Sequence, residues 1–246
     1  MSTITIGVLG IKIKGTQLTT ALQGAFLEHI NHLNALKDLT AETLVPIEVR
    51  NQSDLQKCNA LIIPGGESTT IALVAEREGL LTHLREFVKS LPLPSIVDSR
   101  KKNPTWGTCA GLILLSEKTS NPKKNGQELI GGLPICTTRN YFGSQIASFE
   151  IPLSLTPLST PFPAIFIRAP IVEEIYNDEG LEVLGKLEVH DHKGQREVVV
   201  AVRKGNLLGT AFHPELTEDI RLHEWWVREV VIPALKSKND IKEMYN

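Results

Sequence analysis

The chain has 246 residues, of which 41% are hydrophobic and 22% are charged, and its formal net charge is −2. This balance argues against binding to nucleic acid, which needs a concentrated basic field, and no apolar run is long enough to cross a membrane. Three cysteines do not make a disulfide framework, so we expect a cytoplasmic protein without a secretory signal. The length favours a single domain over residues 1–246.

The first half of the sequence alternates between strand and helix patterns. β-Branched, alternating segments predict strands, and apolar residues at helical spacing predict helices. The recurrence of strand, loop and helix indicates a mostly parallel sheet covered by helices on both faces, a three-layer α/β sandwich. The predicted strands lie at 4–9, 44–49 and 60–66, and the predicted helices at 25–36, 68–75 and 80–89.

The second half has a different pattern. Short β-like segments joined by turn residues predict antiparallel additions that make the sheet mixed. A last helix is expected at about 221–235, and the polar tail from about residue 236 is expected to fray. The β-like segments lie at 164–169, 181–189, 197–205 and 206–212.

The stretch GTCAGL (107–112) places a cysteine between glycines, after a strand and ahead of an apolar helical run. This pattern is typical of a nucleophile elbow, with Cys109 where many hydrolases have serine. Glycines permit the sharp turn, and the start of a helix favours the reactive thiolate. The alternative is a buried structural cysteine, which is the interpretation we give to Cys58 and Cys136.

The stretch FHPEL (212–216) spaces an imidazole and a carboxylate two residues apart. In an extended segment His213 and Glu215 would share one face, so that the carboxylate orients a general base for the cysteine. A surface His and Glu around a turn proline is the alternative. The other histidines have no metal-ligand spacing, so no metal and no other cofactor is expected; they are His29, His32, His83, His190, His192 and His223.

The stretch PGGEST (64–69) follows an apolar strand and opens a helix. Its adjacent glycine N–H groups suit the stabilisation of an oxyanion. The alternative is an ordinary strand-to-helix turn in which Ser68 or Thr69 is the N-cap.

Together these motifs resemble the class I, triad-type glutamine amidotransferases, and most closely the glutaminase subunits of pyridoxal 5'-phosphate synthase, the enzyme of a vitamin B6 pathway. The resemblance implies a flavodoxin-like fold. Six stretches carry it, in family order and over nearly the whole chain. They are LQGAFLEH (22–29), LIIPGGESTT (61–70), WGTCAGLI (106–113), RNYFGSQ (139–145), FIRAP (166–170) and FHPELT (212–217).

The resemblance also implies a mechanism. Cys109 would attack the side-chain amide of L-glutamine, His213 would transfer protons, and Glu215 would hold His213. The ammonia would pass to a separate (β/α)8-barrel synthase subunit that builds pyridoxal 5'-phosphate. An arginine suits the α-carboxylate of glutamine, because a guanidinium binds it through two hydrogen bonds. The glutamine-binding residues implied by the resemblance are Gln23, Gly65, Gly66, Glu67, Arg139, Ile167 and Arg168.

The chain departs from the family pattern near its N-terminus. Family members run directly from the first strand into the glutamine-bearing loop, whereas here GVL (7–9) and ALQGAFLEH (21–29) are separated by an 11-residue insertion at 10–20. The insertion is polar and rich in Lys and Thr, so we expect the fold to survive it, because lengthening a surface loop costs little closure entropy. Gln23 is the predicted site residue that it most exposes to displacement.

Two other functions remain open from the sequence. One is a different cysteine hydrolase of the same fold, although Ala110 stands where such enzymes have a histidine beside the nucleophile. The other is a binding subunit of the same complex that has lost catalysis through the insertion. The presence of Cys109, His213 and Glu215 argues against the second.

Overall fold

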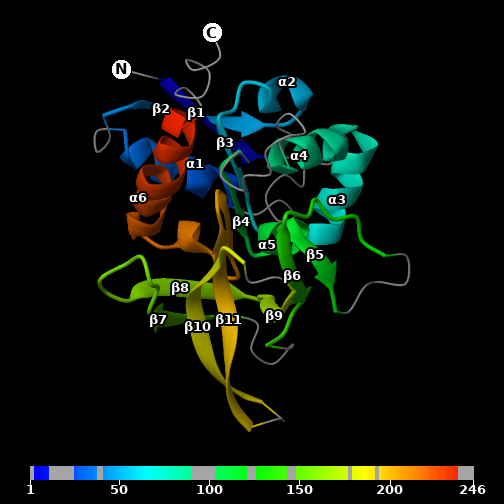
Figure 1. Cartoon of the computed structure of the whole chain (residues 1–246), viewed down its shortest axis with the longest axis vertical. Helices are drawn as coiled ribbons and strands as arrows, with labels where there is room; N and C mark the ends of the chain where they lie inside the picture. The colour runs from blue at the N-terminus through cyan, green and yellow to red at the C-terminus, as the bar shows by residue number, and fades with distance from the viewer. Residues whose placement is uncertain are drawn as a thin grey trace.

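The computed structural model describes residues 3–10, 25–37, 41–89, 103–120, 126–142, 148–176, 179–191 and 194–237. Most of the insertion, together with Gln23 and the tail beyond residue 237, lies outside these residues. Figure 1 shows two groups of helices on either side of a central sheet, with further strands below them. The predicted α/β sandwich with a mixed, mostly parallel sheet is therefore confirmed.

The centre of the molecule is a run of five parallel strands. β1 (Thr3–Leu9) lies between β2 (Thr43–Val49) and β3 (Ala60–Ile63), and β4 (Thr105–Thr108) and β12 (Leu207–Thr210) follow on the β3 side. Every residue of β3, β4 and β12 is buried. Their apolar sequences follow from this, because helices cover both faces of a parallel sheet.

The sheet becomes mixed beyond β12. β11 (Gly194–Lys204) runs antiparallel to β12 and is followed by β9 (Ile171–Ile175), β6 (Leu133–Thr138) and β5 (Ser116–Thr119). β10 (Leu181–Asp191) pairs with β11 and completes the ten strands that the described residues contribute to this sheet. The long β10–β11 hairpin projects from the lower end of the molecule (Figure 1).

Of the predicted antiparallel additions, 181–189 and 197–205 join the main sheet, whereas 164–169 contributes to a separate two-stranded sheet and 206–212 is only partly an antiparallel addition. The segment 206–212 forms β12, which is antiparallel to β11 but also parallel to β4 inside the sheet. A separate two-stranded sheet joins β7 (Ser148–Leu153) to β8 (Phe162–Ile167). Sequence patterns missed β5, β6, β7 and β9: β5, β6 and β9 lack a period of two, and β7 alternates but contains Pro152, which argues against a strand.

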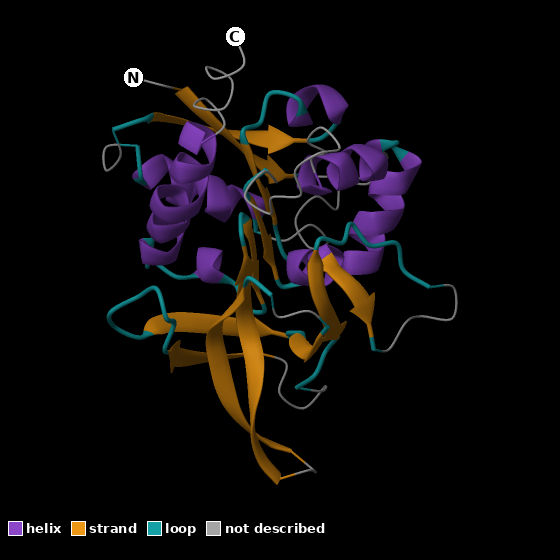
Figure 2. Cartoon of the chain, in the orientation of Figure 1, coloured by secondary structure: helices purple, strands orange, loops and turns teal. Residues whose placement is uncertain are grey.

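The helices form two groups on opposite faces of the sheet (Figure 2). α1 (Phe26–Ala35) and α6 (Arg221–Trp226) lie together, and α3 (Ser68–Arg77), α4 (Leu80–Lys89) and α5 (Ala110–Leu115) lie on the other side. A short helix that the sequence did not reveal, α2 (Gln52–Leu55), is capped by the Asn51 side chain, which accepts a hydrogen bond from the backbone N–H of Asp54. Four residues are too few to show a helical period.

The last helix continues beyond α6. Residues 221–237 are helical throughout, with a π-helical segment at Val227–Val231. The helix was predicted at about 221–235, and residues 236 and 237, where fraying was expected to begin, are still helical. Trp226 is fully buried and its ring packs 5.6 Å from that of Trp106 on β4. This pair fixes the last helix on the sheet.

Helix α5 packs so closely on β3 that a glycine is required at the contact. A Cβ atom at Gly111 would lie 1.9 Å from the backbone carbonyl oxygen of Ile63. This approach places the start of α5, and the residue before it, beside the end of β3.

Replacing Gly111 therefore tests the packing. We expect Gly111→Ala to lower the free energy of unfolding by about 3 kcal/mol or more, because the added methyl group meets rigid backbone. Gly79→Ala is the control: nothing lies within 4 Å of a Cβ there, and only its positive φ of 70° opposes a side chain. The control should lose about 1–2 kcal/mol in urea unfolding. Equal losses in the two variants would contradict the packing argument.

Candidate active site

Cys109 lies at a sharp turn between β4 and α5. Its φ of 49° is in the left-handed region, which non-glycine residues rarely adopt, and its backbone N–H donates to the carbonyl of Thr210 on β12 at 2.8 Å. A Cβ at Gly107 would lie 2.4 Å from the Gly111 carbonyl, so the turn needs glycine on this side as well. Backbone strain of this kind costs about 1–3 kcal/mol and is concentrated at functional sites. The geometry is that of a nucleophile elbow.

His213 and Glu215 follow β12, next to this turn. The His213 Nδ1–H donates to Glu215 Oε1 at 2.8 Å, and the His213 backbone N–H donates to the carbonyl of Ile165 on β8 at 2.8 Å. The sequence suggested that the two side chains share one face of an extended segment, and this is wrong. Pro214 begins a 3-10 turn, η2 (Pro214–Leu216), and this turn folds the carboxylate back onto the ring.

Electrostatics set the charge states of His213 and Glu215. Burial by itself lowers the pKa of His213, but hydrogen bonds to the Cys109 thiol and to Glu215 raise it to about 10. Burial likewise raises the pKa of Glu215, but His29 and His213 together hold that pKa below its usual value. At neutral pH the arrangement therefore favours a carboxylate beside an imidazolium, and the imidazolium stabilises a neighbouring thiolate.

The loop after β3 contacts the same histidine. A Cβ at Gly65 would lie 2.3 Å from His213 Cε1, and Gly66 has a φ of 130°. Both positions therefore need glycine, and the loop brings its backbone against the His213 ring. The helix α3 that follows is capped by Glu67, whose side chain accepts hydrogen bonds from the backbone N–H groups of Thr69 and Thr70. The alternative in which Ser68 or Thr69 is the N-cap is wrong.

Arg139 lies beside this loop. Its guanidinium donates to Glu67 Oε1 at 2.8 Å, to Thr69 Oγ1 at 3.2 Å and to Gln127 Oε1 at 3.0 Å. The structure thus brings together two of the predicted glutamine-binding residues, Glu67 and Arg139. It adds Gln127, which lies in the segment before β6 and which no sequence motif indicated.

The end of β8 closes the other side of Cys109. The Sγ atom of Cys109 lies 3.9 Å from the carbonyl oxygen of Ile167, and Arg168, the next residue, has a φ of 44°. Both side chains are exposed. Gln23, the remaining predicted residue, lies outside the described residues.

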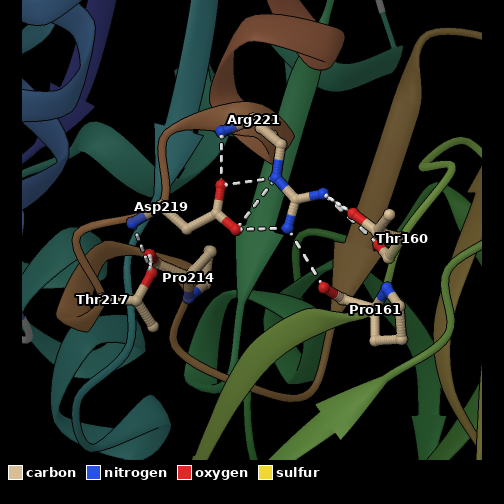
Figure 3. Close-up of polar contacts among 6 residues, drawn as sticks. All are labelled: Thr160, Pro161, Pro214, Thr217, Asp219 and Arg221. Carbon is tan, nitrogen blue, oxygen red and sulfur yellow. Dashed lines mark hydrogen bonds and ion pairs between the residues drawn. The ribbon is translucent and has the colours of Figure 1, made fainter.

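A network of polar contacts anchors the loop that follows Glu215 (Figure 3). Asp219 binds the guanidinium of Arg221, which also donates to Thr160 Oγ1 at 2.5 Å and to the carbonyl of Pro161 at 3.1 Å. Thr160 and Pro161 immediately precede β8, and β8 carries the carbonyl that holds His213. The network therefore fixes the His213–Glu215 turn relative to the strand on which it rests.

The other two cysteines have surroundings unlike those of Cys109. Cys136 is buried within β6. Burial and the nearby Asp54 raise the pKa of the Cys58 thiol to about 12, so this thiol stays protonated at neutral pH. Cys109 is the cysteine that lies beside a histidine, His213.

Three histidines that the sequence left without a role lie behind the triad. His29 and His223 are fully buried, His32 is half-buried, and the three rings follow one another from Glu215 toward the surface. Their sequence spacing gave no signal, because they come from helices nearly 200 residues apart.

The elbow at Cys109, the adjacent His–Glu pair and the α/β sandwich are the features of a triad-type cysteine hydrolase. The chain belongs to the SNO glutamine amidotransferase family, whose model matches residues 19–232. The crystal structure of a glutamine amidotransferase that is 37% identical superposes with a TM-score of 0.68, over 92% of this chain and 98% of that one. None of the helices in the described ranges is long and apolar enough to cross a membrane.

Curated relatives agree with this family. A probable pyridoxal 5'-phosphate synthase subunit of Saccharomyces cerevisiae is 42% identical over 241 residues, which cover 94% of this chain and 97% of the relative. A pyridoxal 5'-phosphate synthase subunit of Methanosarcina mazei is 37% identical over 213 residues, which cover 86% of this chain and 96% of the relative. The likeness therefore extends over nearly the full length of these proteins.

The buried histidines predict an acid-sensitive fold. Burial lowers the pKa of His29 to about 4 and that of His223 well below 6.5, the usual value. The unfolded chain therefore binds more protons below pH 6.5, and the free energy of unfolding should fall as the pH drops from about 6.5 to 4. The raised pKa of His213 acts the other way: its contribution is complete below about pH 6.5 and is lost as the pH rises toward 10.

Urea unfolding of the wild type and of His223→Gln at a series of pH values checks this. The variant has one buried histidine fewer, so its stability should fall less steeply between pH 6.5 and 4. Parallel curves would mean that His223 is not held neutral in the folded chain.

Proposed function

We propose that this chain is the glutaminase subunit of a pyridoxal 5'-phosphate synthase. It hydrolyses L-glutamine to L-glutamate and ammonia, and it delivers the ammonia to a synthase subunit. The observation that carries the proposal is a strained cysteine beside a histidine that a buried carboxylate orients, in a chain of this family. The names of the curated relatives support the pathway and the partner.

The residues divide the chemistry into two halves. The Cys109 thiolate attacks the side-chain amide carbon of glutamine, and the imidazolium of His213 donates its proton to the departing nitrogen, which leaves as ammonia. A glutamyl thioester remains on Cys109. Neutral His213 then takes a proton from water, the hydroxide displaces the thiolate, and glutamate is released. Glu215 stabilises the imidazolium and keeps Nδ1 protonated, so that Nε2 faces the reaction.

The surrounding loops supply binding groups. Backbone N–H groups at Gly65 and Gly66 suit the oxyanion of the tetrahedral intermediate. Arg139 and Glu67 together present a positive and a negative group, which match the α-carboxylate and α-ammonium of glutamine. Ile167 and Arg168 border the nucleophile at the end of β8, and Gln23 would complete the set. Because Arg139 is engaged by Glu67 in this structure, substrate must share or exchange that ion pair.

The partner that we propose is a (β/α)8-barrel synthase subunit. A different cysteine hydrolase of this fold is the second candidate, but no described residue beside Cys109 favours it: Ala110 occupies the position of the expected histidine.

Substitutions in the triad test the mechanism. We expect Cys109→Ala to lower kcat for glutamine hydrolysis by about 10⁴-fold or more, with His213→Asn nearly as severe. Glu215→Gln should cost less, about 10²- to 10⁴-fold, because it removes an orienting group and not the nucleophile. Glutamate release by the complex with the synthase subunit is the assay, and Cys58→Ala is the matched control that should keep normal turnover. Turnover by Cys109→Ala near the wild-type rate would exclude the thioester.

Association with the synthase should control activity. We expect the isolated chain to be a poor glutaminase and the complex to be faster, by up to about 10²-fold if docking completes one oxyanion-hole contact. Measuring kcat/KM with increasing synthase subunit would show the gain and its saturation. Full activity of the isolated chain would contradict this coupling.

A further inference from the structure

A row of buried imidazoles leads away from the triad through its carboxylate. His29 Nε2 lies 3.3 Å from Glu215 Oε2, His29 Nδ1 lies 2.8 Å from His223 Nε2, and His223 Nδ1 lies 3.2 Å from His32 Nδ1. Helix α1 supplies His29 and His32, and α6 supplies His223. The proposed reaction uses none of these three rings.

His29 contacts the Glu215 oxygen that His213 does not use. Oε1 accepts the hydrogen bond from His213, whereas Oε2 is buried and has no hydrogen bond of normal geometry from the described residues. His29 Nε2 also lies 3.4 Å from Thr108 Oγ1, beside the nucleophile. One N–H group thus faces both the carboxylate and the residue before Cys109.

The acceptors determine which ring atoms carry protons. Burial lowers the pKa of His29 to about 4, against the opposing effect of Glu215, so the ring is neutral at pH 7. A carboxylate can only accept, and leaving Oε2 without a donor is costly, so we place the His29 proton on Nε2 and the Thr108 hydroxyl as an acceptor beside it. His29 Nδ1 must then accept from His223 Nε2–H, which leaves His223 Nδ1 to accept from His32 Nδ1–H. Each ring donates toward Glu215.

We propose that His29 is a positioning residue of this active site: its Nε2–H holds Glu215 in the orientation that serves His213, and His223 and His32 hold His29 in the required tautomer. This role rests on the proposed glutaminase function. A carboxylate with a fixed second oxygen cannot rotate away from the imidazole, and small displacements of positioning groups cost up to about 10²-fold in rate.

A purely structural role is the alternative explanation of the same rings. His29 and His223 pack on Trp106, with ring centroids 5.9 Å and 4.8 Å away, so both also fill the space between the helices and the sheet. Loss of packing would lower stability, more for Asn than for the longer Gln, but it would not by itself shift the pH profile of Cys109 or change kcat for the folded enzyme. This difference separates the two roles.

Substituting His29 by Gln or by Asn tests the two ring nitrogens of His29 separately. The amide of His29→Gln reaches the position of Nε2 and can donate to Glu215, whereas that of His29→Asn reaches only the position of Nδ1, on the His223 side. We expect Asn to lower kcat by about 10- to 100-fold with little change in KM, and Gln to restore kcat to within about 3-fold of wild type. His83→Gln, on the outer surface of α4, is the matched control and should behave as wild type.

A second readout needs neither glutamine nor partner. The Glu215 contacts raise the pKa of His213, so weakening them should move the alkaline limb of Cys109 alkylation by iodoacetamide to lower pH. We expect this shift in His29→Asn and not in His29→Gln. The groups facing His29 are Glu215 and His213 beside η2, His223 on α6 and His32 on its own helix.

The outcomes separate the two proposals. Equal kcat values and equal alkylation profiles for the Asn and Gln variants would overturn the positioning role. Failure of the wild-type complex to release glutamate would instead overturn the glutaminase function, and the alkylation profiles would still decide the role of His29. If both variants unfold, ¹⁵N chemical shifts of wild-type histidines decide: His29 protonated on Nε2 supports the role, and protonation on Nδ1 contradicts it.

Discussion

The site is organised around the carboxylate of Glu215, which is 2% exposed and lies between the imidazole rings of His213 and His29. Glu215 binds His213 through one oxygen and faces His29 with the other. Burying an ionised carboxylate is unfavourable unless donors surround it, so this position requires partners on both sides. The 3-10 turn at Pro214, the strand behind His213 and helix α1 are all arranged around that requirement.

The sheet brings these partners together. β3, β4 and β12 are parallel neighbours, so their carboxyl ends share one edge, and the Gly65 loop, Cys109 and His213 each follow one of them. The tie from Arg221 to the residues before β8 fixes the His213 turn from outside the sheet. The strain at Cys109 persists because α5 and β12 hold the residues on both sides of it.

Sequence patterns predicted those features of the site that depend on residues close together in the chain. The glycines around Cys109 and the two-residue spacing of His213 and Glu215 are visible in a few letters, and the buried strands of the parallel half have distinctive apolar runs. His29 was not predicted, because Glu215 and His223 lie 186 and 194 residues away and nothing near it in the sequence marks them. The N-cap of α3 was also predicted wrongly. Glu67 caps this helix in place of Ser68 or Thr69, and its carboxylate is bound by Arg139, which is distant in sequence.

The position of β12 has a consequence for how the chain folds during synthesis. This strand comes late in the sequence, yet it lies inside the sheet between β4 and β11. While residues 207–210 are still within the ribosome, β4 has an open edge and the carbonyl of Thr210 is missing from the backbone of Cys109. Pairing across about 100 residues is slow and leaves an edge strand exposed. Cys109 therefore takes its final backbone geometry only after residues 207–210 have joined the sheet.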